Sequence, residues 1–348
     1  MPAPSPSQIE VIAPNLKRRL SGVTATVVRL IPVQARMIGI VTTGPGLPPD
    51  LPHVSLASLF ALKRDRWRVW HARRNTEMAL GLILRHVFRR KLRLMFTSAS
   101  QRKHSAYTKW LIDRMEALVS TSSRTAAYLD HPSRVIMHGI DTDSFSPATD
   151  RAALRARLGL PEGVLIGCYG RIRAQKGTDV FVRAMIAALP HYPDATALVM
   201  GRATEGHGDF LKSLQAEVAA AGLSSRILFP PEVPVSDMAD WYRALDLYVA
   251  PQRWEGFGLT PLEAMACGVP VVATRVGAFE DLVTPEIGTL IPPGEVEAMT
   301  AALRPWLDDP AALAAAGRAA REATVTRHRI EDEARALVAV YRDLLART

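Results

Sequence analysis

The stretch VLIGCYGRIRAQKGTDVFVRAMIAA, residues 164–188, decides the fold class of this chain. Its apolar run Val164–Tyr169 is typical of a buried strand, and a loop with a glycine at each end leads from it into a helical pattern at Gly177–Ala188. Strands that alternate with helices form parallel sheets covered by helices on both faces. The stretch therefore predicts an α/β fold with a ligand loop at the carboxyl end of a strand.

The same alternation runs along most of the 348 residues. Strands are also predicted at Glu10–Ala13, Met37–Thr42, Arg68–His71, Leu92–Thr97, Ala117–Ser120, Arg134–Met137, Ala197–Met200, Arg226–Phe229, Leu247–Ala250, Val269–Ala273 and Gly288–Ile291. We expect two six-stranded, doubly wound Rossmann-like domains, residues 1–145 and 146–325, joined at the turn-rich stretch Asp141–Ala148. Residues 326–348 contain a long helical pattern that we expect to pack back on the N-terminal domain.

The positive charge is concentrated in the N-terminal half. The chain has a net charge of +9, yet residues 1–110 alone hold 19 Lys and Arg against four Asp and Glu. Such a balance indicates an acidic partner: anionic lipid, a phosphorylated acceptor or nucleic acid. Two cysteines in apolar segments, a start without signal-peptide features and apolar runs too short to span a bilayer predict a cytoplasmic protein.

The loop after Tyr169 carries two cations between glycines, Arg171 and Lys176 between Gly170 and Gly177. Glycines allow a close approach of the backbone, and the next helix N-terminus favours an anion. Arg171 offers a planar fork and Lys176 a point charge, which suits a diphosphate and could offset charge on a leaving group without a metal. A solvated basic loop is the alternative interpretation.

A second loop, Glu255-Gly-Phe-Gly-Leu-Thr-Pro-Leu-Glu263, follows the predicted strand Leu247–Ala250. Pro261 suits the first turn of a helix, so Glu263 falls in that turn while Glu255 stays in the glycine loop. Carboxylates accept hydrogen bonds from hydroxyls, so this pair suits a polyhydroxylated ligand. The alternative is that Glu263 only complements the helix dipole.

Together these segments closely resemble the signature of the retaining glycosyltransferases of family 4, which have the GT-B fold. The resemblance rests on Glu255-x7-Glu263, on the Gly-Arg-x4-Lys-Gly segment 170–177, and on the segments 266–273 and 138–147. It covers the chain from about Ile9. It implies two Rossmann-like domains with parallel sheets facing a central cleft, a nucleotide-sugar donor and no cofactor. We expect no metal either, because the one Asp-x-Asp, Asp141 to Asp143, lies at the domain junction.

The resemblance also implies residue roles. Arg171 and Lys176 bind the donor diphosphate, Glu255 binds sugar hydroxyls and Glu263 holds the ribose. Backbone N–H groups come from Phe257, Gly258 and Leu259, and Val233 lies where the base is contacted. In the N-terminal domain the Ser21-Gly22 turn meets the diphosphate or acceptor, with one glycine where the family often has two. His71 corresponds to a histidine that faces the reacting sugar, although a lone histidine at a strand end is more often structural.

The run Pro14–Thr24 resembles that of the lipopolysaccharide core mannosyltransferases, which use GDP-mannose and a Kdo-bearing lipid A precursor. Lys17, Arg18 and Arg19 in this run are placed to meet acceptor carboxylates or phosphates. A basic tract without acids, Arg85–Lys103, has Trp67, Trp70, Phe88, Tyr107 and Trp110 nearby in sequence. Cations and interfacial aromatics predict peripheral contact with an anionic membrane, which places the protein at the inner face of the cytoplasmic membrane. A solvated helix face with buried aromatics is the alternative.

Other functions fit less of the sequence. A nicotinamide-dependent oxidoreductase would carry Gly-x-Gly-x-x-Gly after a strand, but Gly256-Phe257-Gly258 leads to Pro261 instead, and there is no P-loop. A nucleic-acid-binding protein explains the charge but leaves Glu255 and Glu263 without a role. A nucleotide-sugar epimerase on the same scaffold needs an acid–base pair around the sugar that the sequence does not show. A family member with another nucleotide sugar or acceptor remains an alternative.

Overall fold

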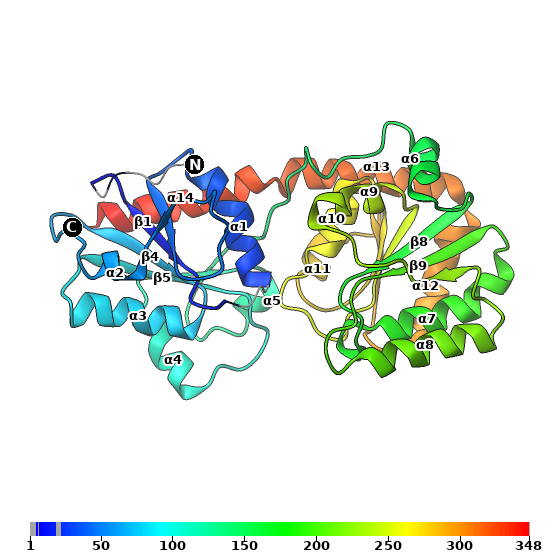
Figure 1. The fold of residues 1–348 in the computed structure, drawn as a ribbon, viewed down its shortest axis with the longest axis horizontal. Coiled ribbons are helices and arrows are strands. Elements are labelled where there is room, and N and C mark those ends of the chain that lie inside the picture. Colours follow the sequence, from blue (N-terminus) through cyan, green and yellow to red (C-terminus); the bar gives the residue numbers. More distant parts are fainter. Residues whose placement is uncertain (1–4, 6, 19–21, 348) are drawn as a thin grey trace. The chain divides into compact units, whose positions relative to one another are not determined.

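The computed structural model describes residues 5, 7–18 and 22–347, and it divides into two compact units (Figure 1). Unit 1 consists of Met1–Gly139 with Ile330–Thr348, and unit 2 of Ile140–Arg329. The division falls before the predicted boundary at residue 145 because Ile140 pairs with Arg329 and its N–H donates to His328 O at 2.8 Å. The turn-rich stretch after Ile140 therefore belongs to unit 2, and residues 326–329 do as well.

Unit 1 contains, in the part that the structure describes, a parallel sheet in the order β3-β2-β1-β4-β5-β6-β7. Its strands are β1 (Val11–Pro14), β2 (Ile40–Thr43), β3 (His53–Val54), β4 (Arg68–Ala72), β5 (Leu92–Ser98), β6 (Ala117–Ser120) and β7 (Arg134–Val135). Its helices are α1 (Gly22–Gln34), α2 (Leu56–Leu59), α3 (Asn75–His86), α4 (Ala106–Ile112), α5 (Ser123–Ala126) and α14 (Ile330–Ala346). The prediction of six strands missed β3, whose two residues are too few to show a periodic pattern.

Successive side chains along the unit 1 strands pack alternately into two hydrophobic cores. Val11 and Ala13 of β1 point to the layer that contains α1 and α14, whereas Ile12 points to the layer of α3 and α4. This alternation is the period of two expected of strands buried on both faces. Helix α14 supplies Leu337, Tyr341 and other buried residues to the first core, so the C-terminal helix is part of unit 1 (Figure 1).

Unit 2 contains, within the described residues, a six-stranded parallel sheet in the order β10-β9-β8-β11-β12-β13. Its strands are β8 (Val164–Tyr169), β9 (Ala195–Met200), β10 (Ile227–Leu228), β11 (Leu247–Ala250), β12 (Val271–Thr274) and β13 (Gly288–Ile291). Its α-helices are α6 (Arg151–Leu158), α7 (Thr178–Ala188), α8 (Gly208–Ala220), α9 (Met238–Arg243), α10 (Thr260–Ala266), α11 (Phe279–Leu282), α12 (Val296–Asp308) and α13 (Pro310–Arg327). Short 3₁₀ turns η1 (Ala174–Lys176), η2 (Leu189–His191) and η3 (Val235–Asp237) complete it. The two Rossmann-like units predicted from the sequence are confirmed.

Each sheet reverses its winding direction once. In unit 2 the chain winds from β8 outward to β10 and then starts again on the other side of β8 with β11. In unit 1 the same reversal sets β1 beside β4. Ligands of open α/β sheets bind at such switch points, outside the carboxyl ends of the strands. The loops after β8 and β11, and those after β1 and β4, are therefore the places where each unit can form a site.

Candidate active site

The predicted donor residues all lie at the carboxyl edge of the unit 2 sheet. Gly170, Arg171 and Lys176 follow β8, Glu255, Phe257, Gly258 and Leu259 follow β11, Glu263 lies in the first turn of α10, and Val233 lies beyond β10. Because β8 and β11 are neighbours in the sheet, the two loops that the sequence singled out face each other across the switch point.

Two residues of different loops are in direct contact in this site. Lys176 Nζ and Glu255 Oε2 form an ion pair, and both side chains are largely buried. The predicted diphosphate-binding cation and the predicted sugar-binding carboxylate therefore lie next to each other. Arg171, by contrast, is exposed at the edge of the loop, so its guanidinium is accessible to an anion.

Arg253, which sequence reasoning missed, holds the two loops together. Its guanidinium forms a bidentate pair with Asp179 at 2.7 and 2.8 Å and also donates to Ala174 O at 2.6 Å. Its backbone N–H donates to Gln175 O at 3.0 Å. Burial alone would raise the pKa of Asp179, but the hydrogen bonds and charge of Arg253 outweigh burial and hold that pKa below its ordinary value. The ionised pair thereby fixes the β8 loop against the β11 loop.

Two glycines permit the close packing of these loops. Gly177 has φ +72°, and a Cβ there would lie 1.8 Å from Pro251 O. Gly258 has φ +86°, and a Cβ there would lie 2.3 Å from Phe279 Cε1. A side chain at Gly177 would push the β8 loop away from the β11 loop, and one at Gly258 would collide with Phe279 of α11. At both positions a side chain would also strain the backbone.

Glu263 is oriented by a buried tyrosine. The Tyr242 hydroxyl donates to Glu263 Oε2 at 2.8 Å. Burial, together with the charge of Glu263, raises the pKa of Tyr242 well above its ordinary value, so the hydroxyl keeps its proton and remains a donor. Tyr242 was not predicted, because nothing in the pattern at Met238–Arg243 shows which side of that helix meets α10.

In unit 1 the predicted acceptor residues lie after β1. Lys17 and Arg18 are exposed, and α1 begins at Gly22, which is exposed as well. Arg19 and Ser21 fall outside the described residues. Behind this loop, Arg74 donates to Asn15 Oδ1 at 2.9 Å, to Glu77 Oε1 at 2.7 Å and to Thr24 Oγ1 at 3.1 Å. This network, which the sequence did not reveal, joins the β1 and β4 loops across the second switch point.

His71, which the resemblance places toward the reacting sugar, lies in β4 near its carboxyl end. Its side chain is fully buried in unit 1, with Nδ1 2.7 Å from the Tyr341 hydroxyl and Nε2 2.6 Å from the Thr97 hydroxyl. Burial, helped by the charge of Arg73, lowers the pKa of His71 well below its ordinary value and keeps the ring neutral. Both ring nitrogens are therefore engaged in a structural hydrogen-bond chain.

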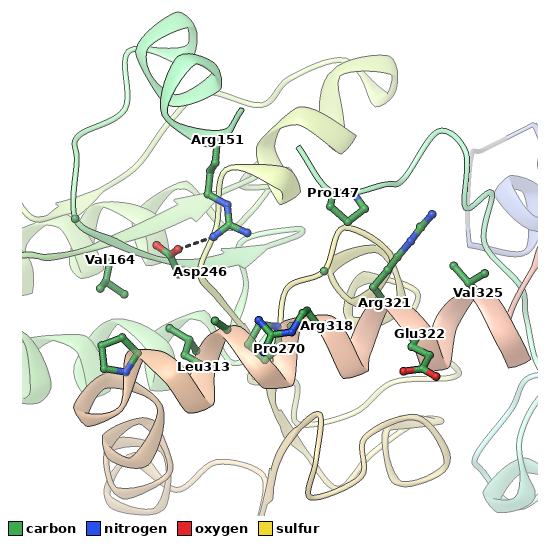
Figure 2. Close-up of a pocket in the computed structure, with 15 residues that line it drawn as sticks. Pro147, Arg151, Val164, Asp246, Pro270, Leu313, Arg318, Arg321, Glu322 and Val325 are labelled. Atoms are coloured by element: carbon green, nitrogen blue, oxygen red, sulfur yellow. Dashed lines mark hydrogen bonds and ion pairs between the residues drawn. The ribbon is translucent and has the colours of Figure 1, made fainter. Parts of the chain in front are cut away.

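A large cavity of unit 2 lies at the edge of the sheet opposite to the donor loops. It measures about 650 Å³, and the chain around it comes from the amino ends of β8, β11 and β12 and from one side of α13. Figure 2 shows Arg151 paired with Asp246 on one wall and Leu313, Arg318 and Arg321 projecting from α13 on the other. At the donor loop itself, the pocket around Arg171 and Lys176 encloses only about 10 Å³. The residues predicted for the donor site therefore do not line the large cavity.

Two further properties bear on the function. Across the residues that the structure describes, no helix is both long and apolar enough to cross a membrane. In the same residues, no group of three or more His, Cys, Asp or Glu side chains could hold a metal ion.

Comparison with known proteins identifies the family. Residues 150–323, which include both donor loops, match the family described as glycosyl transferases group 1. This chain belongs to that family. The glycosyltransferase is 54% identical over 347 residues to the lipopolysaccharide core biosynthesis mannosyltransferase LpsB of Rhizobium meliloti (strain 1021), covering 97% of this chain and 98% of that one. It is 52% identical to LpcC of Rhizobium leguminosarum bv. viciae, a protein with the same description, over 98% of each chain.

Solved structures agree on the fold. The Anabaena protein HepE in complex with UDP superposes with a TM-score of 0.85 at 18% identity, over 96% of this chain and 100% of that one. The C-terminal domain of the Francisella tularensis group 1 glycosyltransferase LpcC is 36% identical over 55% of this chain and all of that domain, with a TM-score of 0.53. The glycosyltransferase has the predicted GT-B fold, with Rossmann-like units of seven and six strands in the described residues.

Proposed function

We propose that this glycosyltransferase transfers mannose from GDP-mannose to a Kdo-bearing lipid A precursor of the lipopolysaccharide core, with retention of the anomeric configuration. The observation that carries the proposal is its similarity, over almost the full length of both chains, to two proteins described as lipopolysaccharide core mannosyltransferases. HepE in complex with UDP supports the use of a nucleotide-linked donor on this fold. An enzyme with this acceptor works at the inner face of the cytoplasmic membrane.

The two loops of unit 2 supply the groups that such a donor needs. Arg171 and Lys176 take the diphosphate and offset the negative charge that grows as it leaves. Glu255 accepts hydrogen bonds from the sugar hydroxyls, and Glu263, held by Tyr242, accepts from the ribose. Backbone N–H groups of Phe257, Gly258 and Leu259 meet the sugar and phosphate, and Val233 contacts the base. The Lys176–Glu255 ion pair exchanges partners when the donor binds, so each charge remains compensated.

The acceptor meets the basic loop of unit 1. Lys17 and Arg18 bind carboxylate and phosphate groups of the Kdo-bearing lipid, and the exposed start of α1 at Gly22 lies in the same loop. The acceptor hydroxyl attacks the anomeric carbon on the face from which the diphosphate departs. The new bond joins the acceptor oxygen to the anomeric carbon, the bond to the diphosphate oxygen breaks, and the acceptor proton passes to the diphosphate. No metal or other cofactor is invoked.

A donor panel tests the proposal directly. Purified enzyme is incubated with the Kdo-bearing lipid A precursor and GDP-mannose, UDP-glucose or UDP-galactose, and the products are analysed by mass spectrometry and by NMR of the anomeric linkage. We expect a mannosylated product with the α configuration from GDP-mannose alone. Transfer from a UDP-sugar in preference, or a β-linked product, would contradict the proposal.

Glu255 offers a test of the donor site itself. Glu255→Ala should lose transfer because the sugar hydroxyls lose their acceptor and Lys176 loses its partner. Glu205→Ala removes an exposed carboxylate of the same unit and serves as the matched control. Full transfer by Glu255→Ala would remove this residue from the site.

A further inference from the structure

Helices α3 and α4 cover the face of the unit 1 sheet opposite to α1 and α14 (Figure 1). Both helices present apolar side chains to solvent. Ile83 on α3 is 45% exposed, and Val87, one turn further, is 70% exposed. On α4, Tyr107 and Trp110 are 55% and 47% exposed. Their rings are nearly parallel, with centroids 6.3 Å apart and an interplanar angle of 12°. Large apolar groups on adjacent elements indicate a surface that binds something.

This outward side of α4 is separate from the side that holds the helix in place. Thr108, Leu111 and Ile112 are buried against unit 1, and Asn75 at the start of α3 donates to Thr108 Oγ1 at 2.7 Å. Tyr107 and Trp110, three residues apart, form a stripe on the other side. Helix α4 thus has one apolar face that packs on the core and a second apolar face that is exposed to solvent.

Every charge between residues 78 and 112 is positive, although Asp113 caps the end of α4 and Lys109 pairs with Asp130 at 2.7 Å. Residues 78–112 hold eight Lys and Arg and no Asp or Glu. Arg85 and Arg93 are engaged with Glu116 at 3.0 Å each. Arg89, Lys91 and Lys103 are exposed and form no ion pair with any residue that the structure describes. The surface therefore combines exposed apolar groups with uncompensated cations.

The aromatic residues that lie near the basic tract in sequence differ in their burial and contacts. Trp70 is fully buried and its indole N–H donates to Glu77 O at 2.8 Å. Trp67 lies under the Arg93 guanidinium, 4.2 Å from the ring centroid, and Phe88 packs edge-on against Phe60. Within that group, Tyr107 and Trp110 have amphipathic rings that are exposed to solvent.

We infer that the outward sides of α3 and α4, with the cations at Arg89, Lys91 and Lys103, form a docking surface for an anionic phospholipid bilayer. Tyrosine and tryptophan favour the headgroup level of a bilayer, aliphatic side chains enter its apolar edge, and basic residues are attracted to its surface charge. Nucleic acid fits less well, because its phosphates make no favourable contact with the aliphatic side chains of Ile83 and Val87. The inference rests on the proposed function for the lipid acceptor that brings the enzyme to a bilayer.

Vesicle binding without donor or acceptor tests the surface. The full-length enzyme is sedimented with vesicles of phosphatidylcholine alone or with added phosphatidylglycerol, at low and high salt. We expect preferential binding to the anionic vesicles that weakens with salt. Tyr107→Ser/Trp110→Ser should lower the partition coefficient about tenfold, and Lys91→Gln/Lys103→Gln about 30-fold, at roughly 1 kcal/mol per cation.

Matched controls lie in unit 2. Val235 is 87% exposed and Lys212 is exposed on α8, so Val235→Ser and Lys212→Gln make the same chemical changes on the other unit and should leave binding unchanged. Wild-type binding by Tyr107→Ser/Trp110→Ser overturns the inference, and so does a loss of equal size in the controls. Preferential retention on an RNA duplex instead of anionic vesicles also overturns it.

Sugar transfer to a deacylated, water-soluble Kdo acceptor separates this inference from the proposed function. The four variants should transfer at wild-type rates to that acceptor. Vesicle binding without transfer to either acceptor contradicts the proposed function alone. Transfer without selective binding to anionic vesicles contradicts the docking surface alone.

Discussion

The two switch points of this glycosyltransferase are alike in topology and different in chemistry. At both, the loops of two neighbouring central strands meet outside the carboxyl ends of a parallel sheet. In unit 2 the charged residues there, Lys176 and Glu255, come from separate loops and form an ion pair with each other. In unit 1, His71 at the end of β4 and Glu77 in the first turn of α3 are fully buried and bond to other parts of the same unit.

The difference teaches that position at a switch point does not by itself make a residue part of the chemistry. A group whose hydrogen-bonding capacity is used in a fully buried chain cannot reach a ligand, whereas an ion pair that is not fully buried, such as Lys176–Glu255, can exchange partners. His71 has both ring nitrogens occupied, whereas Arg171 remains exposed. The accessible charged groups that we propose for the donor therefore lie in unit 2, whereas His71 and Glu77 of unit 1 bond within their own unit.

Among the variants that test this comparison, Lys176→Ala should have the largest effect, which is a loss of turnover. The substitution removes the cation that offsets charge on the leaving diphosphate, and we expect turnover to fall by about 10²–10³-fold, as for loss of one electrostatic contact to a transition state. Steady-state kinetics with saturating donor measures the change, and circular dichroism verifies the fold. Lys212→Ala, an exposed lysine of the same unit, is the control. Turnover close to wild type would remove Lys176 from the diphosphate site.

Arg253→Ala should have the next largest effect, through geometry and not through contact with the donor. Loss of the bidentate bond to Asp179 frees the β8 loop from the β11 loop. We expect KM for the donor to rise about tenfold with a smaller change in turnover, because a loosened site binds the donor less well in its ground state. Arg183→Ala, which removes a cation 3.8 Å from the same Asp179 on the helix surface, should leave KM unchanged. Equal effects of the two variants would contradict the positioning role of Arg253.

His71→Ala tests the other side of the comparison. It leaves the Thr97 and Tyr341 hydroxyls without their partner and opens a cavity in the core, so we expect unfolding to become easier by about 2–4 kcal/mol. Turnover of the folded enzyme should change by less than about threefold, because the ring does not reach a substrate. Urea unfolding and active-site-normalised kinetics measure the two quantities. A loss of turnover of 10²-fold or more with unchanged stability would restore His71 to the reaction.

Tyr341→Phe is the matched variant for that experiment. It removes one hydroxyl of the same chain, which also accepts from Gln34 Nε2 at 3.2 Å. We expect a loss of about 1–2 kcal/mol in the free energy of unfolding and no change in turnover. A larger effect on turnover than on stability in this variant would indicate that the chain around His71 serves the reaction.

Much of this arrangement could be predicted from residue order, and the exceptions have a common physical cause. β8, β11 and α10 have the predicted bounds, because each is set by a local run of apolar residues and by a nearby glycine or proline. The short strand β3 was missed because its two residues gain their extended form from pairing with β2. Its neighbours in space, and not its own sequence, determine its structure.

The same cause explains the site residues that were missed or misassigned. Arg253 and Asp179 are 74 residues apart, and their pairing depends on the register between two loops. The sequence left open whether His71 faces the sugar or is structural, and its bond to Tyr341, 270 residues further along the chain, could not be read from residue order. Residue type and spacing singled out two loops for the donor, and these loops are neighbours in the structure. Type and spacing could not indicate which polar groups the fold would use for itself.

The smallest effect is expected at His328, which is the unit 2 counterpart of the buried, neutral His71 of unit 1. Burial, and to a lesser extent Arg327, lowers its pKa to about 4. A histidine whose folded pKa lies below its unfolded value stabilises the fold when neutral, and that contribution is lost as pH falls from about 6.5 toward 4. Between pH 7.5 and 5.5 we expect His328 to account for roughly 1.4 kcal/mol of lost stability.

Urea unfolding followed separately for the two units can assign this loss. His328→Asn should flatten the pH dependence of unit 2 and leave that of unit 1, where His71 has its pKa lowered for the same reason, unchanged. His53→Asn, at an exposed histidine of unit 1, should alter neither. If the pH dependence of unit 2 survives in His328→Asn, then acid sensitivity resides in its carboxylate pairs, of which Arg253–Asp179 is the first to examine because it holds the donor loops. That outcome would tie the stability of unit 2 at low pH to the same contact that shapes its site.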